Sequence, residues 1–218
     1  MIFMSEFYSL YRGASAEIEE KKSRFIATIE PATSEEEASA FIAKLKKQYW
    51  DARHNCSAFV IGDDGQIMRS SDDGEPSGTA GRPMLEVLKG EKITNAVVVV
   101  TRYFGGTLLG TGGLIRAYQS AVKEALKECV VLKKIPGIKV SVTTDYTDYG
   151  KIQYMAASNK WNVNSTDFAD KVITELVVEL DVLDEIIKTI NEATAARAVI
   201  ECGDEVTFSY VDGKVMFM

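Results

Sequence analysis

Residues 96–128 read AVVVVTRYFGGTLLGTGGLIRAYQSAVKEALKE, and this stretch decides the fold of the first half of the chain. Ala96 to Val100 is a run of mainly β-branched residues without polar alternation, which predicts a strand buried on both faces. Gly113 to Glu128 has apolar residues at helical spacing, which predicts a long amphipathic helix. The glycine-rich loop between them therefore joins the end of a buried strand to the start of a helix.

Shorter elements surround this stretch in the first half. The expected strands are residues 7–11, 24–29, 57–61 and 66–69. Ser34 is a suitable N-cap for a helix that starts with three glutamates, because its hydroxyl can accept from a first-turn amide. Phe41, Ile42 and Leu45 form the apolar face of that helix. Gly62–Gly65 separates two of the strands and predicts a hairpin turn.

The second half has a regular element order. The expected strands are residues 139–144, 161–168, 172–180 and 206–211, and the expected helices are 148–158 and 183–193. This βαββαβ order with short connections predicts a ferredoxin-like sandwich. The dipeptide Pro136-Gly137 interrupts regular structure after the long helix. We therefore expect an α+β protein with two domains, residues 1–134 and 135–218.

The charge of the chain is unevenly distributed. The net charge of −7 comes from residues 136–218, which hold 7 Lys+Arg and 14 Asp+Glu, whereas residues 1–135 hold 18 of each. A protein that grips nucleic acid with its whole surface has a basic excess, and this chain has none. RNA binding would thus need a local patch, and no DNA partner is expected.

The remaining composition indicates a cytoplasmic globular protein. The chain has 218 residues, of which 46% are hydrophobic and 26% charged, as in ordinary globular domains. The N-terminal MIFMSEFYSL meets Glu6 too early for a secretory signal, and the longest strongly apolar run is far too short to span a membrane. Three cysteines without CxxC spacing and the single His54 predict neither disulfides nor a zinc site. We expect no metal, no cofactor and no membrane partner.

The glycines of the chain are concentrated in two segments that are candidates for ligand binding. Nine of the sixteen glycines fall between residues 74 and 113, within or beside the segments 72–83 and 101–118. Amides at the start of the predicted helix, with Arg102 and Arg116, could hold an anion. Alternatively, the glycines simply permit tight packing of the loop. The candidate ligand-binding residues are Asp73, Glu75, Ser77, Gly78, Thr79, Arg102, Gly105, Gly106, Gly110, Gly112, Gly113 and Arg116.

Other reactive side chains have a structural explanation beside the functional one. The three carboxylates within residues 72–75 could hold a hard cation or act as acid and base. We favour the alternative that they satisfy turn amides and pair with arginines such as Arg82. His54 and Cys56 could form a nucleophilic pair, but a buried cysteine is usually a small hydrophobe and no third orienting residue is evident. Tyr146, Tyr149, Tyr154 and Trp161 could form an aromatic binding face, or they could belong to the core between a helix and the sheet. We favour the core.

Four motifs resemble those of one known family. They are DDGEPSGTAGRP at 72–83, TRYFGGTLLGTGGLIRAY at 101–118, KSRFIA at 22–27 and ARHNCSA at 52–58. Together they resemble the signature of the IMPACT/YigZ family. The resemblance covers the first half by motif and the second half by element order, and it points to the two-domain bacterial members.

The resemblance carries expectations about fold and role. It implies a first domain like the second domain of ribosomal small-subunit protein five, and a ferredoxin-like second domain like the end of elongation factor G. Eukaryotic relatives regulate translation by competing for a scaffold protein that activates a stress-response kinase. Those relatives have a different second domain, so that partner is not transferred. The family supplies no established catalytic residues.

Sequence and resemblance together favour a cytoplasmic, translation-associated regulator that binds RNA, the ribosome or a translation protein and is not an enzyme. Its glycine-rich face would be the binding surface, with Arg102 and Arg116 contacting phosphate or carboxylate. The alternative is a small enzyme or binding protein for a phosphorylated metabolite in the same pocket, with a carboxylate from residues 72–75 as base. A third hypothesis is a protein-interaction module anchored by Tyr103 and Phe104.

Overall fold

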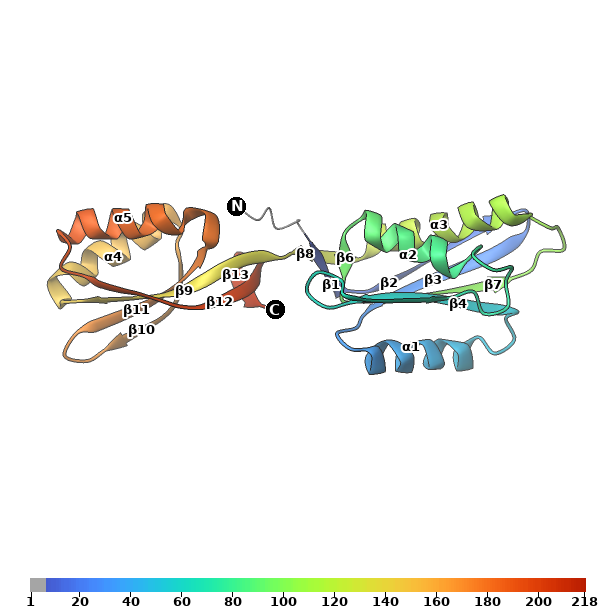
Figure 1. Ribbon diagram of the computed structural model, residues 1–218, viewed down its shortest axis with the longest axis horizontal. Coiled ribbons are helices and arrows are strands. Elements are labelled where there is room, and N and C mark those ends of the chain that lie inside the picture. The colour runs from blue at the N-terminus through green and yellow to red at the C-terminus, as the bar shows by residue number, and fades with distance from the viewer. Residues whose placement is uncertain (1–6) are drawn as a thin grey trace. The chain divides into compact units, whose positions relative to one another are not determined.

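The computed structural model describes residues 7–218, which form two compact units that divide between Lys133 and Lys134. Residues 1–6, on which the prediction about a secretory signal partly rests, lie outside the described range. Within that range no helix has both the length and the hydropathy needed to cross a membrane. Each unit has its own sheet and hydrophobic core, so the chain is an α+β protein as predicted (Figure 1).

The N-terminal unit is built on a five-stranded antiparallel sheet in the order β2-β3-β7-β4-β5. Its strands are β2 (Ala14–Glu20), β3 (Ser23–Pro31), β4 (His54–Ile61), β5 (Ile67–Ser71) and β7 (Ala96–Tyr103). A smaller sheet consists of β6 (Ile93–Thr94), β1 (Tyr8–Arg12) and β8 (Val130–Lys133). As predicted, the central strand β7 is buried on both faces, because helices cover both sides of it.

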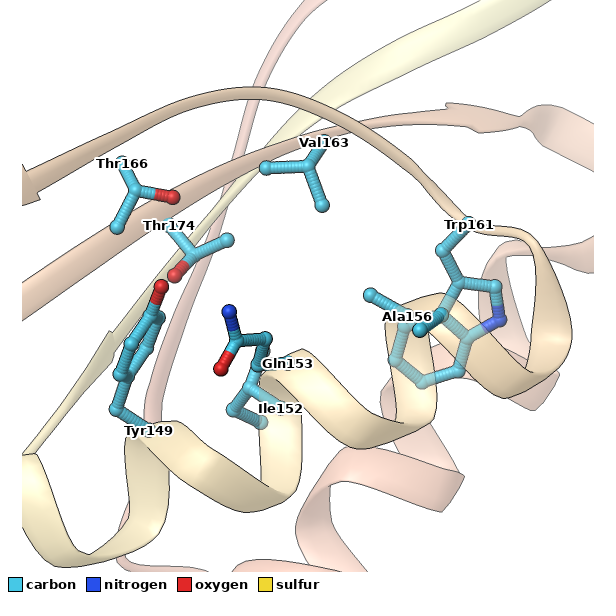
Figure 2. A pocket seen from close by; sticks show the side chains of 9 residues that line it. Tyr149, Ile152, Gln153, Ala156, Trp161, Val163, Thr166 and Thr174 are labelled. Carbon is cyan, nitrogen blue, oxygen red and sulfur yellow. The ribbon is translucent and has the colours of Figure 1, made fainter.

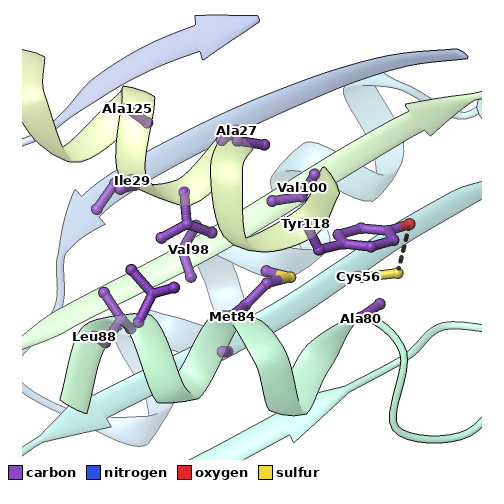
Figure 3. Packing of buried hydrophobic residues seen from close by; sticks show 14 of the residues in the cluster. Ala27, Ile29, Cys56, Ala80, Met84, Leu88, Val98, Val100, Tyr118 and Ala125 are labelled. Atoms are coloured by element: carbon purple, nitrogen blue, oxygen red, sulfur yellow. Dashed lines mark hydrogen bonds between the residues drawn. The ribbon is translucent and has the colours of Figure 1, made fainter. Parts of the chain in front are cut away.

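Three helices enclose this sheet (Figure 1). They are α1 (Glu35–Gln48) on one face, and α2 (Gly81–Gly90) and α3 (Thr111–Glu128) on the other. The Ser34 hydroxyl accepts from the Glu37 amide at 3.2 Å, so the predicted cap is confirmed. Figure 3 shows how α2 and α3 interlock over the sheet, with Met84 and Tyr118 packed between them and β7. Helix α2 was not predicted, because its ten residues begin and end in glycine.

The C-terminal unit has the predicted ferredoxin-like βαββαβ order. Its elements are β9 (Ile135–Thr144), α4 (Tyr146–Asn159), β10 (Asn162–Phe168), β11 (Val172–Glu179), the 3-10 turn η1 (Leu180–Val182), α5 (Leu183–Thr194), β12 (Val199–Val211) and β13 (Lys214–Phe217). The sheet order is β10-β11-β9-β12-β13, with every pairing antiparallel. Helices α4 and α5 pack on one face of it (Figure 1).

The dipeptide Pro136-Gly137 corrects one expectation, because it lies inside β9 rather than interrupting regular structure. Pro136 is opposite Thr207 of β12, whereas the pairing of β9 with β11 begins only at Gly137. Proline lacks an amide hydrogen and is tolerated where one side of a strand is unpaired. The boundary between the two units falls just before this strand in the sequence, and the dipeptide belongs to the second unit.

Candidate binding site at the glycine-rich end of the N-terminal unit

Strand register brings several loops together at one end of the N-terminal sheet. Arg24 of β3 is opposite Tyr103 of β7, and His54 of β4 is opposite Arg102. The starts of β3 and β4 therefore lie beside the end of β7, where α3 also begins (Figure 1). We name this region the glycine-rich end, and it comprises residues 21–24, 51–54, 72–80 and 102–116.

A buried ion pair lies beneath the surface of the glycine-rich end. Arg102 Nη1 is 2.6 Å from Glu75 Oε1, and the two side chains are only 7% and 3% exposed. The guanidinium carbon of Arg102 lies 5.4 Å from the ring centre of Phe25 and 5.7 Å from that of Phe104. Its Nη2 is 3.5 Å from Ser23 Oγ, while its buried Nε has no hydrogen-bond partner among residues 7–218. Cation–π contact and charge pairing together hold this guanidinium in place.

Three further polar side chains surround the Glu75 carboxylate. The Tyr118 hydroxyl donates to Glu75 Oε1 at 2.8 Å, and Cys56 Sγ is 3.3 Å from the same hydroxyl (Figure 3). His54 Nε2 lies 4.0 Å from Glu75 Oε1. The other nitrogen of His54, Nδ1, donates to the Asp73 carbonyl at 2.9 Å, because a carbonyl can only accept. Glu75 is therefore the centre of an internal polar cluster.

The location of Arg102 corrects its predicted role beside a bound anion. Its guanidinium faces the interior and is neutralised by Glu75, so it is not presented to a ligand. The expectation that an arginine pairs with this acidic segment is met, although the arginine is Arg102 and not Arg82. The sequence could not show this, because the two partners are 27 residues apart and meet only through sheet register.

The other two carboxylates of the segment also have structural roles. Asp72 accepts hydrogen bonds at 2.7–3.0 Å from the backbone amides of Gly78, Ala80 and Gly81. Asp73 accepts from the Lys46 ammonium and from the Asn55 amide. Burial opposes ionisation of Asp73, but these two hydrogen bonds, together with the charges of Lys46 and His54, outweigh it and lower its pKa. The favoured explanation, turn amides and internal pairing, therefore accounts for all three carboxylates.

The loop from β7 to α3 shows where glycine is required and where it is not. A Cβ on Gly105 would lie 2.0 Å from the carbonyl carbon of Lys22, so the loop packs directly on the β2–β3 turn. Gly110, the N-cap residue of α3, has φ +73°, a conformation that other residues rarely adopt. Gly112 has neither constraint, since its nearest neighbour would be Arg116 Nη1 at 3.6 Å. Close packing therefore requires glycine at position 105. At position 112 it does not, and Gly112 is exposed to solvent in the first turn of α3.

The surface of the glycine-rich end is basic and partly apolar. Lys21, Lys22, Arg53 and Arg116 are exposed, and none of their side chains has an ion pair or hydrogen bond within residues 7–218. Two apolar side chains of the loop are exposed as well, Phe104 at 42% and Leu108 at 82%. We name these six residues the docking patch. Free cations beside exposed apolar groups are suited to binding a negatively charged macromolecule.

The predicted site residues separate into three groups. Buried residues are Glu75, Thr79 and Arg102. Partly buried residues are Asp73, Gly78, Gly105 and Gly113. Exposed residues are Ser77, Gly106, Gly110, Gly112 and Arg116. The fold brings all of them to the glycine-rich end, but only the last group and its neighbours can meet a partner directly.

Sequence reasoning missed several members of this region. Tyr118 was not predicted as a partner of Glu75, although it follows Leu114 at helical spacing and so shares its buried face. Lys21 and Lys22 form the β2–β3 turn, and β2 was not predicted. Both lysines have positive φ, a feature of tight turns that their sequence does not signal.

Cys56 is predicted to be unreactive in the native protein. Burial, together with the nearby carboxylates, raises the pKa of this thiol to about 12. At pH 8 only about one thiol in ten thousand would be ionised at that pKa, and alkylation requires the thiolate. Iodoacetamide should therefore label the exposed Cys202 first, as peptide mass spectrometry would show. Labelling of Cys56 at the rate of Cys202 would contradict this and revive a nucleophilic role.

Fold and site together define a class of protein: two α+β units, the first of which presents a glycine-rich end over a buried Glu75–Arg102 pair. Residues 21–126 match the Impact N-terminal domain, and residues 142–197 match a domain of unknown function, DUF1949. The chain belongs to the IMPACT family, as the motifs suggested.

Relatives match both units. The chain is 41% identical over 202 residues to the IMPACT family member YvyE of Bacillus subtilis, covering 92% of this chain and 93% of that protein. It is 38% identical over 160 residues to YigZ of Escherichia coli, covering 72% and 78% respectively. A crystal structure of a hypothetical protein is similar with a TM-score of 0.58 at 31% identity, over 93% of this chain and 99% of that chain.

Proposed function

We propose that this chain is a translation-associated binding protein whose docking patch contacts the ribosome through RNA phosphates. The resemblance of its first unit to translation-regulating eukaryotic relatives supports a role in translation. The observation that carries the proposal is the docking patch itself, with four exposed cations that have no partner within residues 7–218. Unpaired lysines and arginines on a rigid surface are the usual means of holding a phosphate backbone.

The balance of charge determines which unit binds. The first unit is neutral overall, so its local cations are not opposed by a general acidic field, whereas the second unit is strongly acidic. Phosphate would be repelled by the second unit and attracted to the docking patch. Phe104 and Leu108 add apolar contacts, which a purely electrostatic grip would lack.

Binding is favoured over hydrolysis at this end because the carboxylates are already engaged. Glu75 is bonded to Arg102 and Tyr118, and Asp72 is bonded to three backbone amides. A general base must reach the proton that it removes, and a carboxylate held by an internal guanidinium is poorly placed to do so. These carboxylates instead fix the loops that carry the docking patch.

Co-sedimentation with ribosomes tests the proposal. The variant Lys21→Asn/Lys22→Asn/Arg116→Gln removes three cations, and asparagine suits the positive φ of both lysines. Each phosphate contact makes the slope of log affinity against log salt more negative by about 0.7–0.9. Loss of three contacts should therefore make the slope less steep by roughly 2–3. We expect wild-type binding that weakens with salt, and almost none from the variant at 150 mM KCl.

The matched control removes the same charge from elsewhere in the first unit. Lys89→Gln/Lys123→Gln/Lys127→Gln changes exposed lysines in the later turns of α2 and α3. This control should sediment like wild type. The proposal fails if wild-type protein does not sediment with ribosomes at low salt, or if both triple variants bind equally. Binding that survives nuclease treatment of the ribosomes would indicate a protein partner instead.

A further inference from the structure

The C-terminal unit contains a cavity that the docking patch does not use. It lies between α4 and the sheet edge formed by β10 and β11, and its volume is about 370 Å³ (Figure 2). This is within the usual range of small-molecule sites, roughly 300–1,000 Å³. The full lining consists of Tyr149, Ile152, Gln153, Ala156, Ala157, Trp161, Val163, Thr166 and Thr174.

The lining combines aromatic and apolar side chains with a few uncharged polar ones, and it carries no Asp, Glu, Lys, Arg or His. Tyr149 and Trp161 stand at opposite ends of the cavity, with Ile152 and Ala156 on the helix side between them (Figure 2). The Tyr149 ring is held edge-on by Phe168 at 5.3 Å between ring centres. Such walls favour an uncharged ligand with flat faces, because an ionised group would find no counter-charge there.

One residue of the cavity lining has a buried hydroxyl without a partner among residues 7–218. Thr174 is 2% exposed, and its Oγ1 has no hydrogen bond within residues 7–218. It lies directly opposite Thr166 across the β10–β11 pair, and both side chains line the cavity. An unpaired buried hydroxyl costs about 1–3 kcal/mol, whereas valine has nearly the same shape and no such cost. A partner that donates to or accepts from this hydroxyl would remove that cost.

The other polar groups of the cavity can both donate and accept. The Gln153 carboxamide extends from α4 toward the strands, and the Thr166 and Tyr149 hydroxyls lie across from it (Figure 2). A carboxamide forms paired hydrogen bonds with the adenine edge that offers one donor and one acceptor. Hydroxyls and a carboxamide in a cavity with an aromatic ring at each end match a nitrogen heterocycle better than an acid.

We propose that this cavity binds a purine base, adenine in particular, with Gln153 on its polar edge and the Thr174 hydroxyl as a further partner. Asp145, Asp167 and Asp170 are exposed around α4 and the β10–β11 turn, where they outnumber the exposed Lys160 and Lys171, so the local charge does not favour phosphate. The ligand class is thus a free base or nucleoside, or an unpaired base of a single-stranded RNA. The free nucleoside should bind better than its phosphorylated forms.

The intrinsic fluorescence of Trp161 provides the assay. The chain has two tryptophans, and Trp50 is 82% exposed in the other unit, so Trp50→Phe leaves Trp161 as the reporter. Full-length Trp50→Phe protein is titrated with adenosine, AMP and a short oligoadenylate. We expect a saturable change with adenosine and a several-fold weaker response to AMP. A stronger response to the oligoadenylate than to adenosine would assign the base to RNA.

Two threonine substitutions make the test specific. Thr174→Val in the same background should weaken adenosine binding about tenfold, the loss of one buried hydrogen bond, while leaving the melting temperature equal or higher. Thr144→Val is the matched control, because Thr144 also has a buried unpartnered hydroxyl on the same sheet but does not line the cavity. It should leave affinity unchanged.

Three results would overturn the proposal. One is no saturable response to adenosine, AMP or oligoadenylate. Another is equal affinity in the Thr174→Val and Thr144→Val proteins. The last is a Thr174→Val protein that binds normally but melts at a lower temperature, since the hydroxyl would then serve only the fold, through ordered water.

Discussion

Glu75→Ala should lower the unfolding free energy of the N-terminal unit by about 3–5 kcal/mol, the usual cost of leaving one member of a buried ion pair uncompensated. Arg102 would keep its charge in an interior site that is 7% exposed, without the carboxylate that now lies 2.6 Å away. The Tyr118 hydroxyl would lose its acceptor at the same time. Urea unfolding followed by hydrogen exchange at the β7 amides would report this loss for the first unit separately.

Glu17→Ala is the matched control for that measurement. Glu17 forms an equally short pair with Arg24, at 2.7 Å, but both side chains are about half exposed. Exposed pairs contribute about 0–1 kcal/mol, because water screens them. A Glu75→Ala protein that unfolds at the same urea concentration as Glu17→Ala would refute the assignment of Glu75 as the centre of the internal cluster.

Gly105→Ala should destabilise the first unit by at least about 1–3 kcal/mol, the usual cost of overpacking. The added methyl group would overlap the backbone of Lys22, which cannot move aside as a flexible side chain could. The β7–α3 loop would then lift from the β2–β3 turn and displace Phe104 from Arg102. Thermal unfolding and susceptibility of the loop to limited proteolysis would both reveal the change.

Gly112→Ala, seven residues further along, should have the opposite effect on stability. Its Cβ would make only ordinary contact with Arg116, and alanine is better than glycine in a helix by up to about 1 kcal/mol. If the partner approaches the first turn of α3 closely, this more stable variant should bind ribosomes more weakly. Gly105→Ala and Gly112→Ala proteins that unfold alike would contradict the described loop geometry.

Local patterns were sufficient for the elements that satisfy strong physical constraints. The apolar run at Ala96–Val100 has no stable environment except between two layers, and Ser34 before three glutamates is an effective helix start. The order of elements in the second half likewise permits few topologies. Helix α2 and strand β2 lacked such signals, because glycines bound the helix at both ends and β2 is half exposed.

The candidate site was predicted at the level of segments rather than contacts. The two glycine-rich segments do meet, and their exposed members lie near cations that have no partner within residues 7–218. The role of Arg102 could not be predicted, because whether an arginine faces solvent or a buried carboxylate depends on a partner strand and loop far away in the chain. The position of Lys22 in the docking patch also depends on a distant part of the chain, because its backbone packs against Gly105.

The amino-acid sequence by itself indicated the family, the ferredoxin-like second unit and the glycine-rich segments that we propose as the binding region of the first unit. The element order follows from hydrophobic periodicity and the family from the resemblance of four motifs, and both can be read from short stretches of the chain. Tertiary structure alone decided which charges within residues 7–218 are paired and which are not, and that Thr174 is part of a cavity lining. Electrostatics and burial depend on distances across strand register and helix packing, and these exist only once the chain has folded.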